Sequence, residues 1–347
     1  MFLPGTNKLY PMMRLIMCSI VIMISYTSSC FSQDIHFSQF FEAPLLRNPS
    51  LAGIFTGDIR VQAVYRDQWN SVTNAYKTAS FNAEYKNPIG KADDFITFGI
   101  QMHYDRAGTV GLTTMHVLPA LNYHKSMSSS RNSYLSLGFM GGIVQRRIDR
   151  SKMITNSVYD GLGDAENFAS NQYTYLDGSV GMSFNTNISD NPADNMFIGV
   201  AFHHFNRPKN SFYRDPSLEL NPKWVYSAGI RFGVTDFSYL TIEADHSQQG
   251  TFQETVGGAL YGFKLGEDPE KPLYTIHAGG FLRWNDAFIP VIKLDYNPFS
   301  VALSYDVNIS KLKPSSYGRG GFELSISYIG FLDRGNSSIH AVRCPRF

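Results

Sequence analysis

The stretch from Phe299 to Ser310 reads F-S-V-A-L-S-Y-D-V-N-I-S. Large apolar side chains alternate in it with small or polar ones; the apolar positions are Phe299, Val301, Leu303, Tyr305, Val307 and Ile309. Successive side chains of a strand point to opposite faces, so the pattern predicts an amphipathic β-strand. Ile292 to Tyr296 and Phe322 to Tyr328 alternate in the same way, with charged residues on the second face. We expect water on that polar face, and either a protein core or lipid on the apolar face.

The same alternation recurs from Asp58 onward, and it predicts about fourteen strands, an even number that is typical of bacterial outer-membrane barrels. The other predicted strands are 59–66, 81–86, 96–105, 115–124, 133–146, 173–184, 196–205, 225–234, 239–245, 255–264 and 274–284. Pro119 lies inside one of them and indicates a bulge or a weak point in the ladder. The fold class that follows is all-β, a transmembrane antiparallel barrel. A soluble protein of two packed sheets would alternate similarly and is the alternative.

The N-terminus has the three parts of an export signal. Lys8 and Arg14 precede an apolar run from Leu15 to Ile24, and small and polar residues follow from Ser25 to Ser32. The run is shorter than the ~20 apolar residues of a membrane helix, so we predict a cleavable signal peptide over residues 1–32. Cleavage before Cys30, as in a lipoprotein, is the alternative.

The rest of the chain divides into three parts. Residues 33–57 contain Pro44, Pro49 and Gly53, which break regular elements, and we expect an irregular segment that plugs or rims the barrel. Residues 58–332 form the barrel, and residues 333–347 form a C-terminal tail. The polar stretches Ile148 to Asn171 and Asn206 to Asn221 are expected to be surface loops.

The composition and motifs give no sign of catalysis or of a cofactor. Lys and Arg number 30 against 29 for Asp and Glu, so nothing suggests nucleic-acid binding. Adjacent strand residues face opposite ways, so His203 and His204 are expected to be one lumenal and one interfacial histidine, not a metal site. We therefore predict no metal, no cofactor and no enzyme, with an embedded lipid hydrolase as the alternative. The inward charges are expected to line a pore or to form a network across the lumen; they are Arg283, Lys293, Asp295, Asp306 and Glu323.

Seven short motifs, in order, resemble those of the PorP/SprF proteins of the type IX secretion system of Bacteroidetes. They are Ser38-Gln39-Phe40 with Asn48-Pro49-Ser50-Leu51-Ala52-Gly53, Tyr65-Arg66-Asp67-Gln68-Trp69, Asp105-Arg106-Ala107-Gly108, the glycine-rich stretch from Gly138 to Asp149, His204-Phe205-Asn206-Arg207-Pro208, Ser304-Tyr305-Asp306-Val307-Asn308 and Gly320-Gly321-Phe322-Glu323. Ser50-Leu51 departs from the family's commoner Ala-Tyr, and the tail after the last strand is unusually long.

The resemblance implies a protein of the cell outer membrane that works with other type IX components. It implies binding of an exported cargo, the C-terminal targeting domain of an adhesin, for secretion or surface anchoring, often in gliding motility. It also implies an interior or partner-binding cluster of seven residues, which are Arg66, Gln68, Trp69, Asp105, Asp306, Asn308 and Glu323. A porin-like small-solute channel is the alternative function. If lipid covers the apolar face, Leu303→Arg should be costly and the same change at Ser304 far milder.

Overall fold

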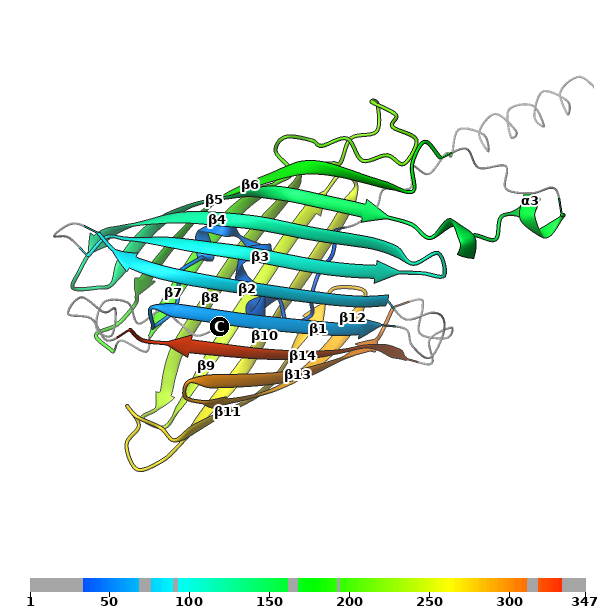
Figure 1. Cartoon of the computed structure of the whole chain (residues 1–347). Coiled ribbons are helices and arrows are strands. Elements are labelled where there is room, and N and C mark those ends of the chain that lie inside the picture. Colours follow the sequence, from blue (N-terminus) through cyan, green and yellow to red (C-terminus); the bar gives the residue numbers. More distant parts are fainter. Residues whose placement is uncertain are drawn as a thin grey trace, which may run out of the picture. The chain divides into compact units, whose positions relative to one another are not determined.

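The described residues form one closed β-barrel. The computed structural model describes residues 34–68, 76–89, 93–161, 168–191, 194–310 and 318–332; the predicted signal peptide, Trp69 and the predicted tail lie outside these ranges. Each strand pairs antiparallel with its neighbours in sequence, and β1 closes the ring against β14 (Figure 1). Closure removes the sheet edges that would otherwise expose unpaired backbone groups to lipid. The predicted all-β transmembrane barrel is confirmed.

The strands agree in number and order with the sequence prediction, and most of them are longer than predicted. The strands are β1 (Ile59–Gln68), β2 (Tyr76–Pro88), β3 (Phe95–Ala107), β4 (Leu112–Ser128), β5 (Ser133–Arg147), β6 (Gln172–Asn187), β7 (Asn195–His203), β8 (Lys223–Thr235), β9 (Ser238–Gln249), β10 (Phe252–Leu265), β11 (Tyr274–Arg283), β12 (Ala287–Tyr296), β13 (Phe299–Asn308) and β14 (Arg319–Gly330). At Pro119 the pairing of β4 with β5 is interrupted without a change of register, so this proline marks a weak point and not a bulge.

The two faces of the wall follow the predicted alternation. In β12 the Ile292 side chain is 64% exposed, whereas its neighbour Lys293 is 4% exposed. In β13, Leu303 lies on the outer face and Ser304 is buried inside. A band of large apolar side chains on the outside suits contact with the hydrocarbon of a bilayer.

The two ends of the barrel differ in the length of their connections. One end, here called the long-loop end, carries residues 148–171 between β5 and β6 and residues 204–222 between β7 and β8. The opposite, short-turn end has two-residue turns at 236–237 and 297–298, and it also holds the start of β1 and the end of β14. Outer-membrane barrels have short periplasmic turns and longer extracellular loops. The long-loop end is therefore assigned to the cell surface.

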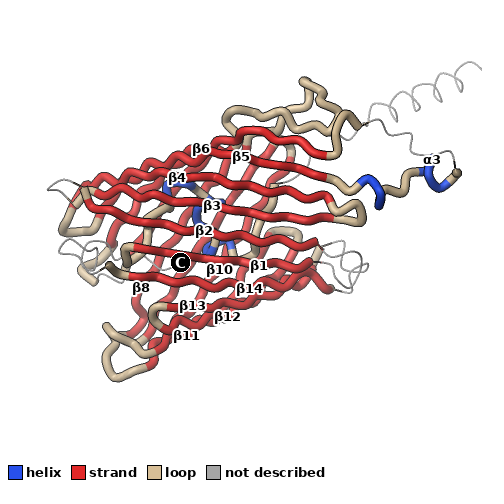
Figure 2. The backbone as a smooth tube through the Cα atoms, in the orientation of Figure 1, coloured by secondary structure: helices blue, strands red, loops and turns tan. Residues whose placement is uncertain are grey.

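Residues 34–57 precede β1 and lie within the ring of strands. They form three short helical turns, η1 (Phe40–Glu42), α2 (Pro44–Arg47) and η2 (Pro49–Leu51) (Figure 2). Two further short turns, η3 (Arg150–Lys152) and α3 (Asn156–Tyr159), belong to the β5–β6 loop. No helix among the described residues is long and apolar enough to cross a membrane.

Candidate functional site

Apolar residues of the N-terminal segment pack onto inward-facing apolar patches of the wall. Phe40 and Phe41 both contact Phe281 of β11, with ring centroids 5.3 Å apart in each pair. Leu45 and Ala52 join a second buried cluster on β4 and β5. The inner face is therefore covered largely by protein where the sequence analysis expected water.

A buried network of hydrogen bonds and ion pairs, here called the Ser38 clasp, holds the segment near the long-loop end. It consists of Ser38, Gln39, Arg66, Arg283, Asp306 and Glu323. The Glu323 carboxylate accepts the backbone N–H groups of Ser38 and Gln39, each at 2.7 Å. The Ser38 hydroxyl donates to Asp306 Oδ1 at 2.6 Å. The wall thus recognises the backbone and side chain of the Ser38-Gln39 pair at once.

Two arginines neutralise the carboxylates of the clasp. Arg66 reaches Asp306 Oδ2 at 2.9 Å and Glu323 Oε1 at 3.1 Å, and it donates to the carbonyl of His36 at 2.6 Å. Arg283 lies 3.2 Å from Asp306 Oδ2. Buried charges persist when they are paired and hydrogen-bonded, and here both conditions hold.

Of the seven predicted cluster residues, the structure brings four together. Arg66, Asp306 and Glu323 meet in the clasp, and the side-chain amide of Gln68 lies beside the Arg66 guanidinium. Two others have hydrogen-bond partners outside the clasp. Asp105 accepts from Thr78, and Asn308 donates to the carbonyl of Arg319. Trp69 lies outside the described residues.

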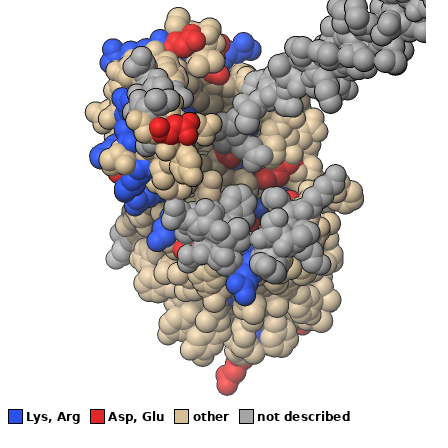
Figure 3. Space-filling view, turned by 90° about the vertical axis from the view of Figure 1, so that its right-hand side faces the viewer, with Lys and Arg blue, Asp and Glu red and all other residues tan. Residues whose placement is uncertain are grey.

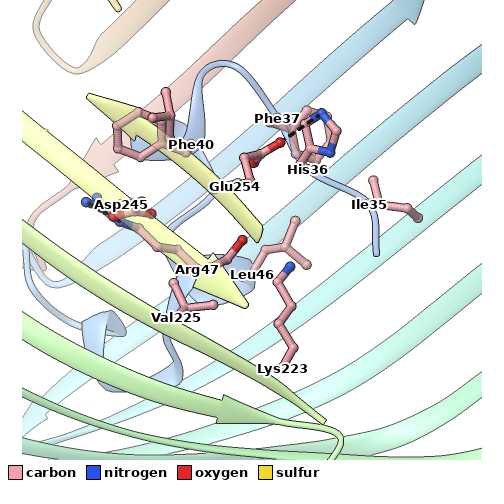
Figure 4. A pocket seen from close by; sticks show the side chains of 13 residues that line it. Ile35, His36, Phe37, Phe40, Leu46, Arg47, Lys223, Val225, Asp245 and Glu254 are labelled. Carbon is pink, nitrogen blue, oxygen red and sulfur yellow. Dashed lines mark hydrogen bonds and ion pairs between the residues drawn. The ribbon is translucent and has the colours of Figure 1, made fainter. Parts of the chain in front are cut away.

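A second anchor, which the sequence analysis missed, is Arg47 in α2. Its guanidinium pairs with Glu243 at 2.7 Å and with Asp245 at 2.6 Å, both on β9, and its Cζ lies 4.7 Å from the centroid of the Phe40 ring. Figure 4 shows Arg47 reaching Asp245 below Phe40. The sequence could have indicated this anchor, because Glu243 and Asp245 lie on the same inward face of one strand. Two buried carboxylates need a cation nearby.

Further anchors follow toward the short-turn end. Lys293 binds Glu42 at 2.6 Å, and Glu84 accepts the N–H of Gly53 at 2.8 Å. The ammonium of Lys86 donates to the carbonyl of Phe55 at 2.7 Å. Polar contacts therefore accompany the segment from one end of the barrel to the other.

His203 and His204 are both buried, so the expectation that one of them is interfacial is wrong. His204 lies just beyond β7 and has a φ of 55°, which takes it out of the strand alternation. Its ring contacts Asp34 Oδ2 at 2.7 Å through Nε2 and Asp177 Oδ2 at 2.8 Å through Nδ1. This Asp34–His204–Asp177 latch fastens the first described residue of the segment.

Two cavities between the segment and the wall are small. One, of about 60 Å³, is lined by residues that include His36, Phe40, Arg47 and Glu254 (Figure 4). Another, of about 30 Å³, adjoins the latch. A water molecule needs roughly 10–15 Å³ on this measure, so such cavities suit a few waters. Within the described ranges, no group of three or more His, Cys, Asp or Glu is placed to hold a metal ion.

The sequence model of one protein family, described as Type IX secretion system membrane protein PorP/SprF, matches residues 29–328. That match covers most of the chain, including the N-terminal segment and nearly all of the barrel. Family and fold are those of a membrane barrel protein. Among curated proteins, none matches this sequence.

Solved structures with the same kind of barrel include two toluene transporters. The Ralstonia pickettii toluene transporter TbuX is 9% identical with a TM-score of 0.50, and the match covers 84% of this chain and 94% of that one. The Pseudomonas putida toluene transporter TodX is 9% identical with a TM-score of 0.50, and the match covers 90% of this chain and 100% of that one. Likeness at this identity shows the fold alone.

Proposed function

The chain belongs to the PorP/SprF family of type IX secretion system membrane proteins, and on this premise we propose that its barrel is a docking partner for an exported surface protein. The protein is a secretion-related β-barrel of the outer membrane. The cargo we propose is the C-terminal targeting domain of an adhesin, held for secretion or for anchoring at the surface in gliding motility. Other components of the secretion system are its further partners.

The observation that supports docking over conduction is the occupied lumen. Residues 34–55 cross it and are fixed by the Ser38 clasp, by Arg47 and by the latch. A rigid, filled barrel presents its loops as a platform, and loops on a rigid scaffold commonly carry binding function. The loop segments at the long-loop end display large apolar side chains, among them Ile154 at 76% and Tyr159 at 84% exposed.

A porin-like small-solute channel is the second candidate. Two solved barrels of similar fold are described as toluene transporters, which is the observation in its favour. At 9% identity this likeness carries no substrate to the present chain. The buried ion pairs across the lumen count against an open pore.

Deletion of the gene tests the docking function. We expect the adhesin to be lost from the cell surface, and the wild-type gene to restore it. Complementation with an Ile154→Asp, Tyr159→Asp variant should restore the barrel but not full display, because charges replace the exposed apolar contacts. Met127→Asp with Leu273→Asp, which changes two exposed apolar residues at the short-turn end, is the matched control. Normal adhesin display in the deletion strain would contradict the proposal.

A further inference from the structure

Three cations form a lateral row on the outer face of the barrel, near the long-loop end. Lys77 of β2 lies directly opposite Arg106 of β3, Arg106 lies opposite Thr113 of β4, and Thr113 lies opposite Arg147 of β5. All three cationic side chains are exposed. They share the outward side of their strands with Phe81, Tyr104 and Ile143, which belong to the apolar outer face.

The residues that the structure describes neutralise this row only in part. Among the described residues, none of the three cations makes a side-chain hydrogen bond or an ion pair. One acid, Asp67, lies opposite Lys77 in the register but is not bonded to it, so the row carries a formal charge of +2, three cations less one anion. Like charges directly opposite each other in a sheet are destabilising. A bound anion would therefore reduce the repulsion between Lys77 and Arg106.

The position of the row, at the level of the lipid head groups, indicates that the anion is a lipid phosphate. It lies at the strand ends, one step beyond the outward apolar residues Tyr104 and Met115, where a bilayer changes from hydrocarbon to head groups. Figure 3, which looks at the long-loop end, shows Lys and Arg gathered along one edge. Adjacent strands are about 4.8 Å apart, so Arg106 and Arg147 are spaced by about 10 Å, a span that suits more than one phosphate. Arginine is the preferred side chain for bidentate phosphate binding.

We infer that Lys77, Arg106 and Arg147 bind the phosphate groups of a phosphorylated glycolipid in the outer leaflet. Lipid binding here fixes the depth and tilt of the β2–β5 side of the barrel, next to the β5–β6 loop. The inference uses the outer-membrane location and the assignment of the long-loop end to the surface. It does not depend on the cargo.

The test measures the apparent Kd of the purified full-length mature protein, in dodecyl maltoside, for bisphosphoryl lipid A. A Lys77→Gln, Arg106→Gln, Arg147→Gln variant should bind on the order of a hundredfold more weakly, because each cation near such a surface contributes roughly fivefold. Raising NaCl from about 50 to about 300 mM should weaken wild-type binding and change the variant little. Inorganic phosphate at about 10 mM should not displace the lipid, since it lacks the acyl chains that bind the apolar band below the row.

A matched variant, Arg131→Gln, Arg214→Gln, Lys271→Gln, removes three exposed cations outside the row that likewise have no ion-pair partner among the described residues, and it should bind like the wild type. The shift in gel mobility on heating shows that each variant is folded. Equal affinity of the row variant and the wild type would overturn the inference. Equal wild-type affinity for dephosphorylated lipid, or for phosphatidylglycerol at the same mole fraction, would also overturn it. So would displacement of the lipid by free phosphate.

Discussion

Small residues in the wall decide whether the N-terminal segment fits into the lumen. A Cβ at Gly138 would overlap the backbone of Pro49 and Ser50, and one at Gly181 would overlap the side chain of Asn48. The glycine-rich character of β5 is visible in the sequence, and glycines in a strand suit either sharp curvature or close approach of another backbone. Which backbone approaches was not visible, because the partner is about ninety residues away in sequence.

We expect Gly138→Val to displace the segment around Pro49. Overpacking of this kind costs about 1–3 kcal/mol, so the thermal midpoint of the barrel in detergent should fall. Gly257→Ala is the control, since its Cβ would meet its nearest neighbours at an ordinary 3.4 Å. An unchanged midpoint and unchanged protease resistance of the segment in Gly138→Val would show that the contact is not tight.

The carboxylate of Glu323 binds two backbone N–H groups and one guanidinium, so its removal leaves all three without their partner. We expect Glu323→Ala to lower the free energy of unfolding by about 3–5 kcal/mol, the range for breaking a buried pair. Lys125→Ala breaks the half-exposed pair with Asp94 and should cost about 1 kcal/mol or less. Chemical denaturation in detergent measures both. Equal losses would mean that the clasp is not a strong anchor.

The clasp also shows what sequence alone predicts at the scale of residues. Arg66, Asp306 and Glu323 were expected to form an interior cluster from motifs that lie far apart in the chain. Their partners Ser38 and Gln39 were recognised as a motif but not as the bound group. The contact of Ser38 and Gln39 with this cluster depends on the path of the segment through the lumen. The alternation of residues in the strands does not predict that path.

At the scale of elements, the outer face of β13 gives a direct test of lipid contact. Leu303→Arg places a charge in the middle of the strand, where it should destabilise the barrel by about 2–4 kcal/mol. Gln145→Arg, on the exposed outer face near the end of β5, should cost about 0–1 kcal/mol. Unfolding from lipid vesicles measures the difference. Similar costs at both positions would contradict a lipid-covered middle.

Ser304 is no longer a suitable mild control for that experiment. The sequence analysis assumed a hydrated inner face, but Ser304 is buried and its Oγ accepts from Gln39 Nε2 at 3.0 Å. An arginine there would collide with the segment. The alternation correctly assigned Ser304 to the inside, and the error came from not knowing what fills that inside.

The latch at the start of the segment should respond to pH. Burial acts to lower the pKa of His204, but Asp34 and Asp177 outweigh it and raise this pKa from 6.5 to about 10. A raised pKa means that protonation stabilises the folded state, fully below about pH 6.5 and progressively less as the pH rises through about 10. Thermal midpoints of the wild type and His204→Gln should therefore differ most near pH 6 and converge near pH 10. A constant difference would contradict this.

For the molecule as a whole, the number of strands and the direction of their faces were predictable because each strand carries its own period-two signal. Closure followed from strand number and from the need to satisfy every backbone group in lipid. The loop lengths then separated the two ends. The occupied lumen was not predictable in the same way, since residues 33–57 have no regular period and offered only a choice between plug and rim.

The filled lumen makes a prediction that separates docking from conduction. The intact protein in a planar bilayer should give no steady current, because the segment and its buried ion pairs occupy the path that ions would take. A variant that releases the segment, Arg47→Ala with Asp306→Ala and Glu323→Ala, should give currents that rise with salt concentration. A change in the electrophoretic mobility of this variant on heating must first show that the barrel has formed. Steady currents from the wild type would favour the porin-like alternative, while silence from both proteins would mean that the barrel stays closed without these anchors.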